Sequence, residues 1–324
     1  MGNRIWPPVA AFLLLAVLSL TPSPGAHAAD APAYLALGDS LAFGVGATNP
    51  AAEGYVGLTH FELQQSERYA ETDLELINVS VPGATSSELL EPDGQVDEAI
   101  SEIEERLTDN PDAPVEIISL DVGGNDLLAL AEPDSPCIEG TTTEACLDAL
   151  GEMLSTLQAN LREMLVRLRD AAPDAEIYVI DLYNPYSGTG EVQEIVANVA
   201  VQQVNGVISA ASADPELDVH FVSVFELFQG RAAQWIASDG IHPNDDGYRV
   251  MSAALLASIN NQQLVLPSDL AASPSPGATG DALAIGGSDD GVDQLVVLIL
   301  AVVAFLAGAI VSAAYFVTRG RGRL

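Results

Sequence analysis

A serine, a histidine and an aspartate in this chain have the types and settings that nucleophilic catalysis requires. Ser40 follows a short apolar run in the stretch YLALGDSLAFGVG, residues 34–46. A hydroxyl presented at the end of a strand can act as a nucleophile when a general base and oxyanion donors lie nearby. The alternative is an ordinary turn, in which Gly38 and Asp39 reverse the chain and Ser40 caps the next helix.

The predicted general base lies in the loop ASDGIHPNDDGY, residues 237–248, where Asp239 and His242 are three positions apart. In this loop the Nε2 atom of His242 can accept the Ser40 proton, while Asp239 orients the ring and stabilises the imidazolium. His60 lies in a helical pattern and His220 in a strand pattern, so we expect both of them to be structural.

The same loop permits a second interpretation, a metal site. Asp239 and His242 could bind a metal ion together with Asp245 or Asp246. However, acidic residues are favoured in the first turn of a helix, and Asn244 is a plausible N-cap directly before them. We therefore attribute Asp245 and Asp246 to a helix start and predict that the protein uses no metal.

Two further loops contain candidates for an oxyanion hole. Gly83 in NVSVPGATSSELL (78–90) offers a backbone N–H that a substrate can approach without meeting a side chain. Asn125 in LDVGGNDLL (120–128) follows a glycine pair, and its side-chain amide can donate to a developing oxyanion. Ordinary turn chemistry would also explain either loop taken alone.

Alternating strand and helix patterns predict how these loops are positioned. Short β-branched runs alternate with amphipathic helical patterns, which is typical of a doubly wound α/β sandwich. Ligands gather at the carboxyl ends of the strands in such sheets, where the four loops would meet. The first predicted strand ends just before Gly38, and the others are 74–81, 115–123, 175–183 and 219–225. The clearest helical patterns are 146–173, 190–213 and 244–260.

The two ends of the chain predict export and anchoring. Residues 1–28 contain one basic residue, an apolar core and a small-residue cleavage motif, which indicates a secretory signal peptide; an uncleaved N-terminal anchor is the alternative. Residues 295–317 carry no charge and are long enough to span a bilayer. The arginine-containing tail 318–324 predicts a cytoplasmic C-terminus, with the main domain, residues 30–262, outside. Residues 263–294 are predicted to form a flexible linker.

The charge of the chain excludes one class of partner. It contains 46 acidic and 11 basic residues, for a net charge of −35, and no lysine. Such a field repels nucleic acid, so we predict no nucleic-acid binding. Solubility or a saline habitat would each account for the acidity.

Cys137 and Cys146 are the two cysteines of the chain. In an exported protein a close pair predicts a disulfide that closes a small loop. This loop follows the Asn125 segment closely, so it is also a candidate for shaping substrate specificity.

The four loops resemble the signature blocks of the SGNH (GDSL) hydrolase family. The serine, glycine, asparagine and histidine of the family name are matched in order by Ser40, Gly83, Asn125 and His242. The match includes an aspartate two positions before the Ile-His pair, which is Asp239 here.

This resemblance implies a flavodoxin-like three-layer α/β/α sandwich with a mostly parallel five-stranded sheet. It also implies ester hydrolysis without a cofactor, in which Ser40 attacks the acyl carbon. The oxyanion hole would then comprise the backbone N–H groups of Ser40 and Gly83 and the side chain of Asn125. Asp39 and Asp126 are expected to be structural, through hydrogen bonds within their loops.

We therefore predict a serine esterase or lipase that is tethered to the cell membrane by a single span. Its substrate would be a lipid, a short acyl ester or an acylated glycan. A glycan O-acetyl esterase or an acyltransferase would use the same residues, and a non-catalytic surface binding module is the alternative from another class. The intact Ser40, Asp239 and His242 argue against the binding module. Trp235 is expected in the core or, alternatively, in the acyl pocket.

Overall fold

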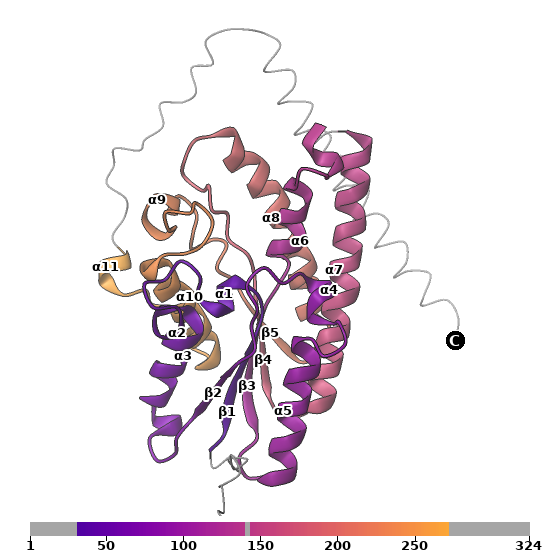
Figure 1. The fold of residues 1–324 in the computed structure, drawn as a ribbon. Coiled ribbons are helices and arrows are strands. Elements are labelled where there is room, and N and C mark those ends of the chain that lie inside the picture. The colour runs from indigo at the N-terminus through magenta and orange to yellow at the C-terminus, as the bar shows by residue number, and fades with distance from the viewer. Residues whose placement is uncertain (1–30, 140–142, 272–324) are drawn as a thin grey trace, which may run out of the picture.

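A five-stranded parallel sheet forms the centre of the protein. The computed structural model describes residues 31–139 and 143–271 (Figure 1). The strand order is β2-β1-β3-β4-β5, and every neighbouring pair is parallel, so the expected mostly parallel sheet is parallel throughout. The strands are β1 (Ala33–Leu37), β2 (Glu75–Asn78), β3 (Val115–Asp121), β4 (Glu176–Ile180) and β5 (Val219–Val222).

The apolar runs of the sequence account for the central strands. All five residues of β1 are buried, and β3 and β4 are buried almost throughout, as expected for strands that are covered on both faces. The observed strands are shorter than the predicted ones because their last residues leave the sheet and enter the loops at its carboxyl edge. These loops contain the candidate residues.

Helices cover both faces of the sheet and give the predicted three layers (Figure 1). On one face lie α3 (Tyr55–Gln64) and α10 (Asp245–Ile259), which pack against each other. On the other face lie α5 (Gln95–Asp109), α7 (Glu144–Ala171) and α8 (Val192–Ser212), with α7 between its two neighbours. The doubly wound α/β prediction is thus confirmed.

Short helices connect these elements, and several of them follow directly from a strand end. The α-helical ones are α1 (Ser40–Phe43), α2 (Pro50–Glu53), α4 (Ser86–Leu89), α6 (Gly124–Leu128), α9 (Ala232–Trp235) and α11 (Ser268–Ala271). The 3₁₀ ones are η1 (Glu67–Tyr69), η2 (Ala129–Ala131) and η3 (Pro136–Glu139).

The packed part of the chain continues past residue 262, where the sequence predicts a linker to begin. Leu270 of α11 is buried, and Asp269 forms an ion pair with Arg249 of α10 at 2.7 Å. One apolar and one acidic side chain give no periodic pattern, which is why this contact was not predicted. The remainder of the predicted linker lies outside the described residues.

The predicted signal peptide, membrane span and cytoplasmic tail also lie outside the described residues. Within 31–139 and 143–271, no helix has the length and apolar character that crossing a membrane requires.

Candidate active site

Ser40 is the first residue of α1, immediately after the turn that ends β1. The N-cap of this helix is Asp39, whose carboxylate accepts the N–H of Leu41 at 2.9 Å. The structure therefore assigns the capping role to Asp39, and the Ser40 hydroxyl, which lies 3.5 Å from Asp39 Oδ1, has a closer partner. That partner is His242, whose Nε2 lies 2.9 Å from the Ser40 Oγ although 202 positions separate the two residues.

The His242 ring is held from its other side by Asp239. Its Nδ1 lies 2.7 Å from Asp239 Oδ2, and Asp239 Oδ1 accepts the backbone N–H groups of Ile241 and His242. Because an ionised carboxylate only accepts hydrogen bonds, Nδ1 carries the proton and Nε2 is free to accept the Ser40 O–H. Tyr183 fixes the same loop by donating its hydroxyl to the Ile241 carbonyl.

Asp239 remains ionised in this setting. Partial burial on its own raises the pKa of Asp239, but the N–H groups of Ile241 and His242 and the His242 ring outweigh this effect. The net result is a pKa below the ordinary value for aspartate. An ionised carboxylate at this position can stabilise positive charge on the imidazole ring.

The two oxyanion candidates lie in loops that a hydrogen bond connects. Asn125 Nδ2 donates to the Ala84 carbonyl at 2.9 Å, next to Gly83, and to Asp39 Oδ2 at 3.1 Å. Gly83 has a φ of +86°, and a Cβ at this position would meet no atom within 4 Å. There is therefore room for a side chain at this position, and it is the backbone conformation that favours glycine.

A buried pair of carboxyl groups lies behind Ser40. Asp121, the last residue of β3, accepts the Asp39 N–H at 3.2 Å and the Tyr55 hydroxyl at 2.6 Å. Burial and the nearby charge of Asp39 raise the pKa of Asp121 well above its ordinary value, while burial also raises that of Asp39. These surroundings favour the protonated form of the Asp121 carboxyl group.

Gly38 makes room for this pair. It has a φ of +147°, and a Cβ there would lie only 2.6 Å from Asp121 Oδ2. Gln95 of α5 holds Gly38 on both sides, because its side chain donates to the Gly38 carbonyl and accepts the Gly38 N–H, both at 2.9 Å. The Gly-Asp-Ser turn thus requires glycine at position 38 for two reasons: its backbone conformation favours glycine, and a side chain there would clash with Asp121.

A small cavity of about 100 Å³ opens beside the Ser40 side chain. Ser40, Asn125 and His242 line one part of it, and the rest is lined mainly by apolar side chains from α6, α8 and the segment after β4. This is a setting in which a reacting acyl group could contact the nucleophile and the oxyanion donors together.

The other residues weighed from the sequence lie in structural positions. The His60 Nε2 is 2.7 Å from the Leu74 carbonyl, and His220 stacks on Tyr178. Trp235 is buried in the core against Phe228, so the core interpretation is correct.

The other acidic residues near the site also have structural roles, because each of them bonds to a neighbouring side chain or backbone group. Asp126 accepts the N–H and the hydroxyl of Ser86. Asp245 accepts the N–H and the hydroxyl of Thr48, and Asp246 pairs with Arg249. Asn244 caps α10 as predicted.

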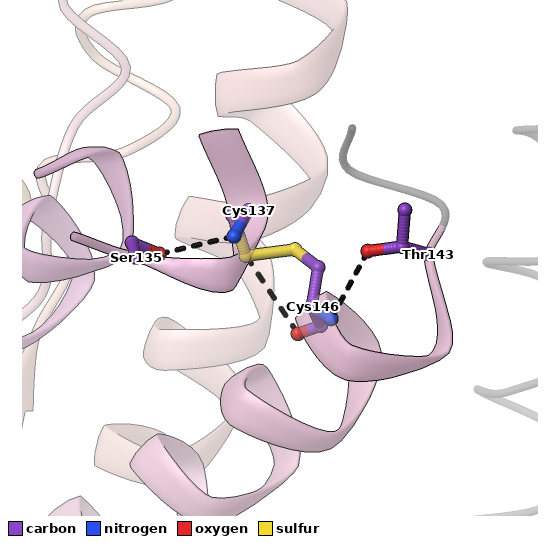
Figure 2. The surroundings of a disulfide bond; sticks show 4 residues. All are labelled: Ser135, Cys137, Thr143 and Cys146. Atoms are coloured by element: carbon purple, nitrogen blue, oxygen red, sulfur yellow. Dashed lines mark hydrogen bonds between the residues drawn. A yellow bond between two sulfur atoms is a disulfide. The ribbon is translucent and has the colours of Figure 1, made fainter. Parts of the chain in front are cut away.

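Cys137 and Cys146 form the predicted disulfide (Figure 2). It joins η3 to the first turn of α7, where Thr143 caps the helix by accepting the Cys146 N–H. Neither cysteine is among the residues that line the cavity beside Ser40. The disulfide therefore fixes the start of α7, and the structure gives no support to a direct role in shaping the cavity.

Four residues around the site were not predicted from the sequence: Asp121, Tyr55, Gln95 and Tyr183. Of these, only Asp121 could have been noticed in the sequence, because an acidic residue at the end of an otherwise apolar strand requires a partner when it is buried. The other three contact residues that are more than 50 positions away in the chain.

Comparisons with known proteins agree with this fold. Residues 36–250 match the family model described as the GDSL-like Lipase/Acylhydrolase family. The chain is 26% identical over 233 residues to the spore germination lipase LipC of Bacillus licheniformis, covering 69% of this chain and 95% of that protein.

Two solved structures share the fold. The lipase Lip_vut3 from a goat rumen metagenome has a TM-score of 0.54 at 23% identity, covering 72% of this chain and all of that one. Phospholipase A1 from Streptomyces albidoflavus has a TM-score of 0.52 at 21% identity, with the same coverage of both chains.

Proposed function

Because this chain belongs to the GDSL-like lipase/acylhydrolase family and is a carboxylic ester hydrolase of that type, we propose that Ser40, His242 and Asp239 form its catalytic triad. The observation that carries this proposal is the unbroken series of hydrogen bonds from Asp239 through His242 to Ser40, at 2.7 and 2.9 Å. No cofactor enters the proposed reaction.

The first half of the reaction forms an acyl-enzyme. His242 Nε2 takes the Ser40 proton as Oγ attacks the acyl carbon, and the C=O electron pair moves onto oxygen. The imidazolium is stabilised by Asp239. As the tetrahedral intermediate collapses, the bond to the alcohol oxygen breaks, and His242 returns the proton to that oxygen.

The second half releases the acid. Water attacks the acyl carbon while His242 takes one of its protons, and the Ser40 oxygen leaves and recovers a proton from His242. In both halves, the backbone N–H groups of Ser40 and Gly83 and the Asn125 amide donate to the oxyanion. The bonds from Asn125 to Ala84 and Asp39 orient the amide before the reaction, and the N–H that faces Asp39 turns to the oxyanion as its charge develops.

The proposed location of the enzyme is the outer face of the cell membrane. The uncharged run 295–317, followed by arginines, and the signal-like residues 1–28 support a single span with the catalytic domain outside. The Cys137–Cys146 disulfide supports an oxidising compartment. Protease treatment of intact expressing cells should remove the catalytic domain and leave a tag on the C-terminus protected. Protection of the whole chain would contradict this topology.

A serine-directed fluorophosphonate tests the nucleophile directly. The full chain in detergent should lose p-nitrophenyl ester hydrolysis on labelling, with the label on Ser40. Ser40→Ala should be inactive and unlabelled. The matched control is Ser238→Ala, an exposed serine next to Asp239, which should retain both activity and label. Activity that survives in Ser40→Ala would overturn the proposal.

A further inference from the structure

We propose that the cavity beside Ser40 is an acyl pocket for short chains, so that the substrates are esters of acids from acetic to butyric. This inference rests on the proposed function, because it requires Ser40 to be the nucleophile. It goes beyond that function by choosing among the lipid, short-acyl and glycan esters that a triad alone would accept.

The position of the cavity favours the acyl group as its occupant. Its walls include Leu127 and Leu128, which follow Asn125 in α6, so it extends from the side where the oxyanion would lie. The acyl group stays on Ser40 after the alcohol leaves, and it therefore needs a site of its own. The alcohol takes its proton from His242, whose own side chain is 22% exposed, so we place the alcohol on the solvent side of the site.

The volume of the cavity limits the length of the chain. An apolar cavity of about 150 Å³ holds benzene, which has six carbon atoms. By the same proportion, the 100 Å³ found here holds roughly four carbon atoms. An acetyl or butyryl group fits within this limit, whereas an octanoyl or palmitoyl group does not.

Buried side chains close the pocket and fix its depth. Leu182 and Val201 are only 5% and 4% exposed, and both belong to the hydrophobic core. The Leu182 backbone is held on both sides by Asn205, which accepts its N–H at 2.9 Å and donates to its carbonyl at 2.7 Å. By contrast, Leu128 is 43% exposed and lies where the pocket meets solvent. A longer chain must therefore displace core residues or remain in water.

Chain-length profiles test this proposal on the full chain in detergent. We expect kcat/KM on p-nitrophenyl esters to be highest for the acetate or the butyrate and at least about tenfold lower for the octanoate. Val201→Ala removes two methyl groups from the wall and should raise the octanoate-to-butyrate ratio about tenfold. Val201→Ile adds one methylene and should lower the butyrate-to-acetate ratio about threefold or more.

Val204→Ala is the matched control. Val204 lies one turn further along α8, is fully buried, and does not line the cavity. It should leave both ratios unchanged. Equal shifts from Val201→Ala and Val204→Ala, or a maximum at the octanoate or palmitate, would overturn the acyl-pocket proposal.

A second series separates the acyl side from the alcohol side. Acetate esters of alcohols of increasing length should respond equally in the parent chain and in Val201→Ala. A change confined to this series would place the alcohol in the pocket and overturn the proposal. Failure of the triad itself would be recognised separately, by a folded chain that neither hydrolyses any ester nor takes the fluorophosphonate on Ser40.

Discussion

Two aspartates flank the Ser40–His242 pair, and the protein holds them in opposite environments. Asp239 is 42% exposed, contacts the His242 ring, and has a pKa below its ordinary value. Asp39 is buried, contacts Asp121 through its backbone, and has a pKa above its ordinary value. One residue type therefore provides a stable negative charge on one side of the nucleophile and, on the other, a carboxyl group whose burial favours its protonated form.

This difference indicates distinct roles in the proposed reaction. A carboxylate that stays ionised beside His242 can stabilise the imidazolium whenever it forms. A buried carboxylate beside the oxyanion hole would oppose the developing negative charge, unless a neighbour shares a proton with it. We infer that Asp121 supplies that proton and that Asp39 acts as a positioning residue, which holds the Leu41 N–H and the Asn125 amide.

Among the substitutions that distinguish the roles of Asp239 and Asp39, Asp239→Asn should reduce activity most. An asparagine amide can donate to Nδ1, which moves the ring proton to Nε2 and prevents His242 from accepting the Ser40 proton. We expect kcat on p-nitrophenyl butyrate to fall on the order of 10³-fold or more. Asp246→Asn is the control, because that carboxylate pairs with Arg249. A fall below about tenfold would remove Asp239 from the triad.

Asp39→Asn should act less strongly, and mainly on kcat. The new side-chain amide places a donor against the Nδ2 of Asn125, which is itself a donor, so the oxyanion amide loses its position. We expect kcat to fall about 10- to 100-fold with KM nearly unchanged. Steady-state kinetics on the butyrate ester measure both values. An unchanged kcat would show that Asp39 is a helix cap and nothing more.

The sequence predicts the exposed group of Ser40, Asp239 and His242 far better than it predicts the buried contacts around Asp39 and Asp121. Ser40, Asp239 and His242 occupy loops after strands, and the carboxyl ends of parallel strands meet at one edge. Residue types and strand patterns are therefore enough to expect them together, and the structure brings them together. The apolar periodicity of the long helices predicts the layers for the same reason, because it depends only on neighbouring positions.

The buried side depends on contacts that no local pattern encodes. Tyr55 meets Asp121 across 66 positions, and Gln95 meets Gly38 across 57. A single tyrosine in an apolar helix is typical of any core, so nothing in its surroundings indicates a buried acid as its partner. The hydrogen bond from Asn125 to Asp39 likewise depends on how the two loops pack, which the sequence pattern does not indicate.

Tyr55→Phe should destabilise the fold by removing the hydroxyl that donates to Asp121. Both side chains are fully buried, so the carboxyl oxygen loses this donor where water cannot replace it. We expect the free energy of unfolding to fall by about 1–3 kcal/mol in urea, followed by the fluorescence of buried Trp235. The control is Tyr34→Phe, which breaks a bond between two hydroxyls, Tyr34 and Ser119. An equal or larger loss in Tyr34→Phe would contradict a special demand from Asp121.

The pH dependence of stability tests directly whether Asp121 keeps a proton in the folded protein. Since the folded-state pKa of Asp121 is raised, the folded protein keeps a proton that the unfolded chain releases above about pH 4. Stability from this group is therefore fully present at low pH and is lost as the pH rises toward the folded-state pKa. The slope for one proton is about 1.4 kcal/mol per pH unit.

Asp121→Asn isolates this contribution. Its amide can keep an oxygen for the Asp39 N–H and present its nitrogen to the Tyr55 oxygen, but it cannot titrate. Asp239 has a lowered pKa, so its contribution to stability rises with pH in the acid range. Such groups are present in both the parent chain and the variant, and their contributions cancel when the two unfolding free energies are subtracted. We expect unfolding free energies measured between about pH 5 and 7 to fall with pH in the parent chain and to vary less in the variant. Parallel curves would mean that Asp121 is ionised in the folded protein and that Asp39 carries its charge without a shared proton.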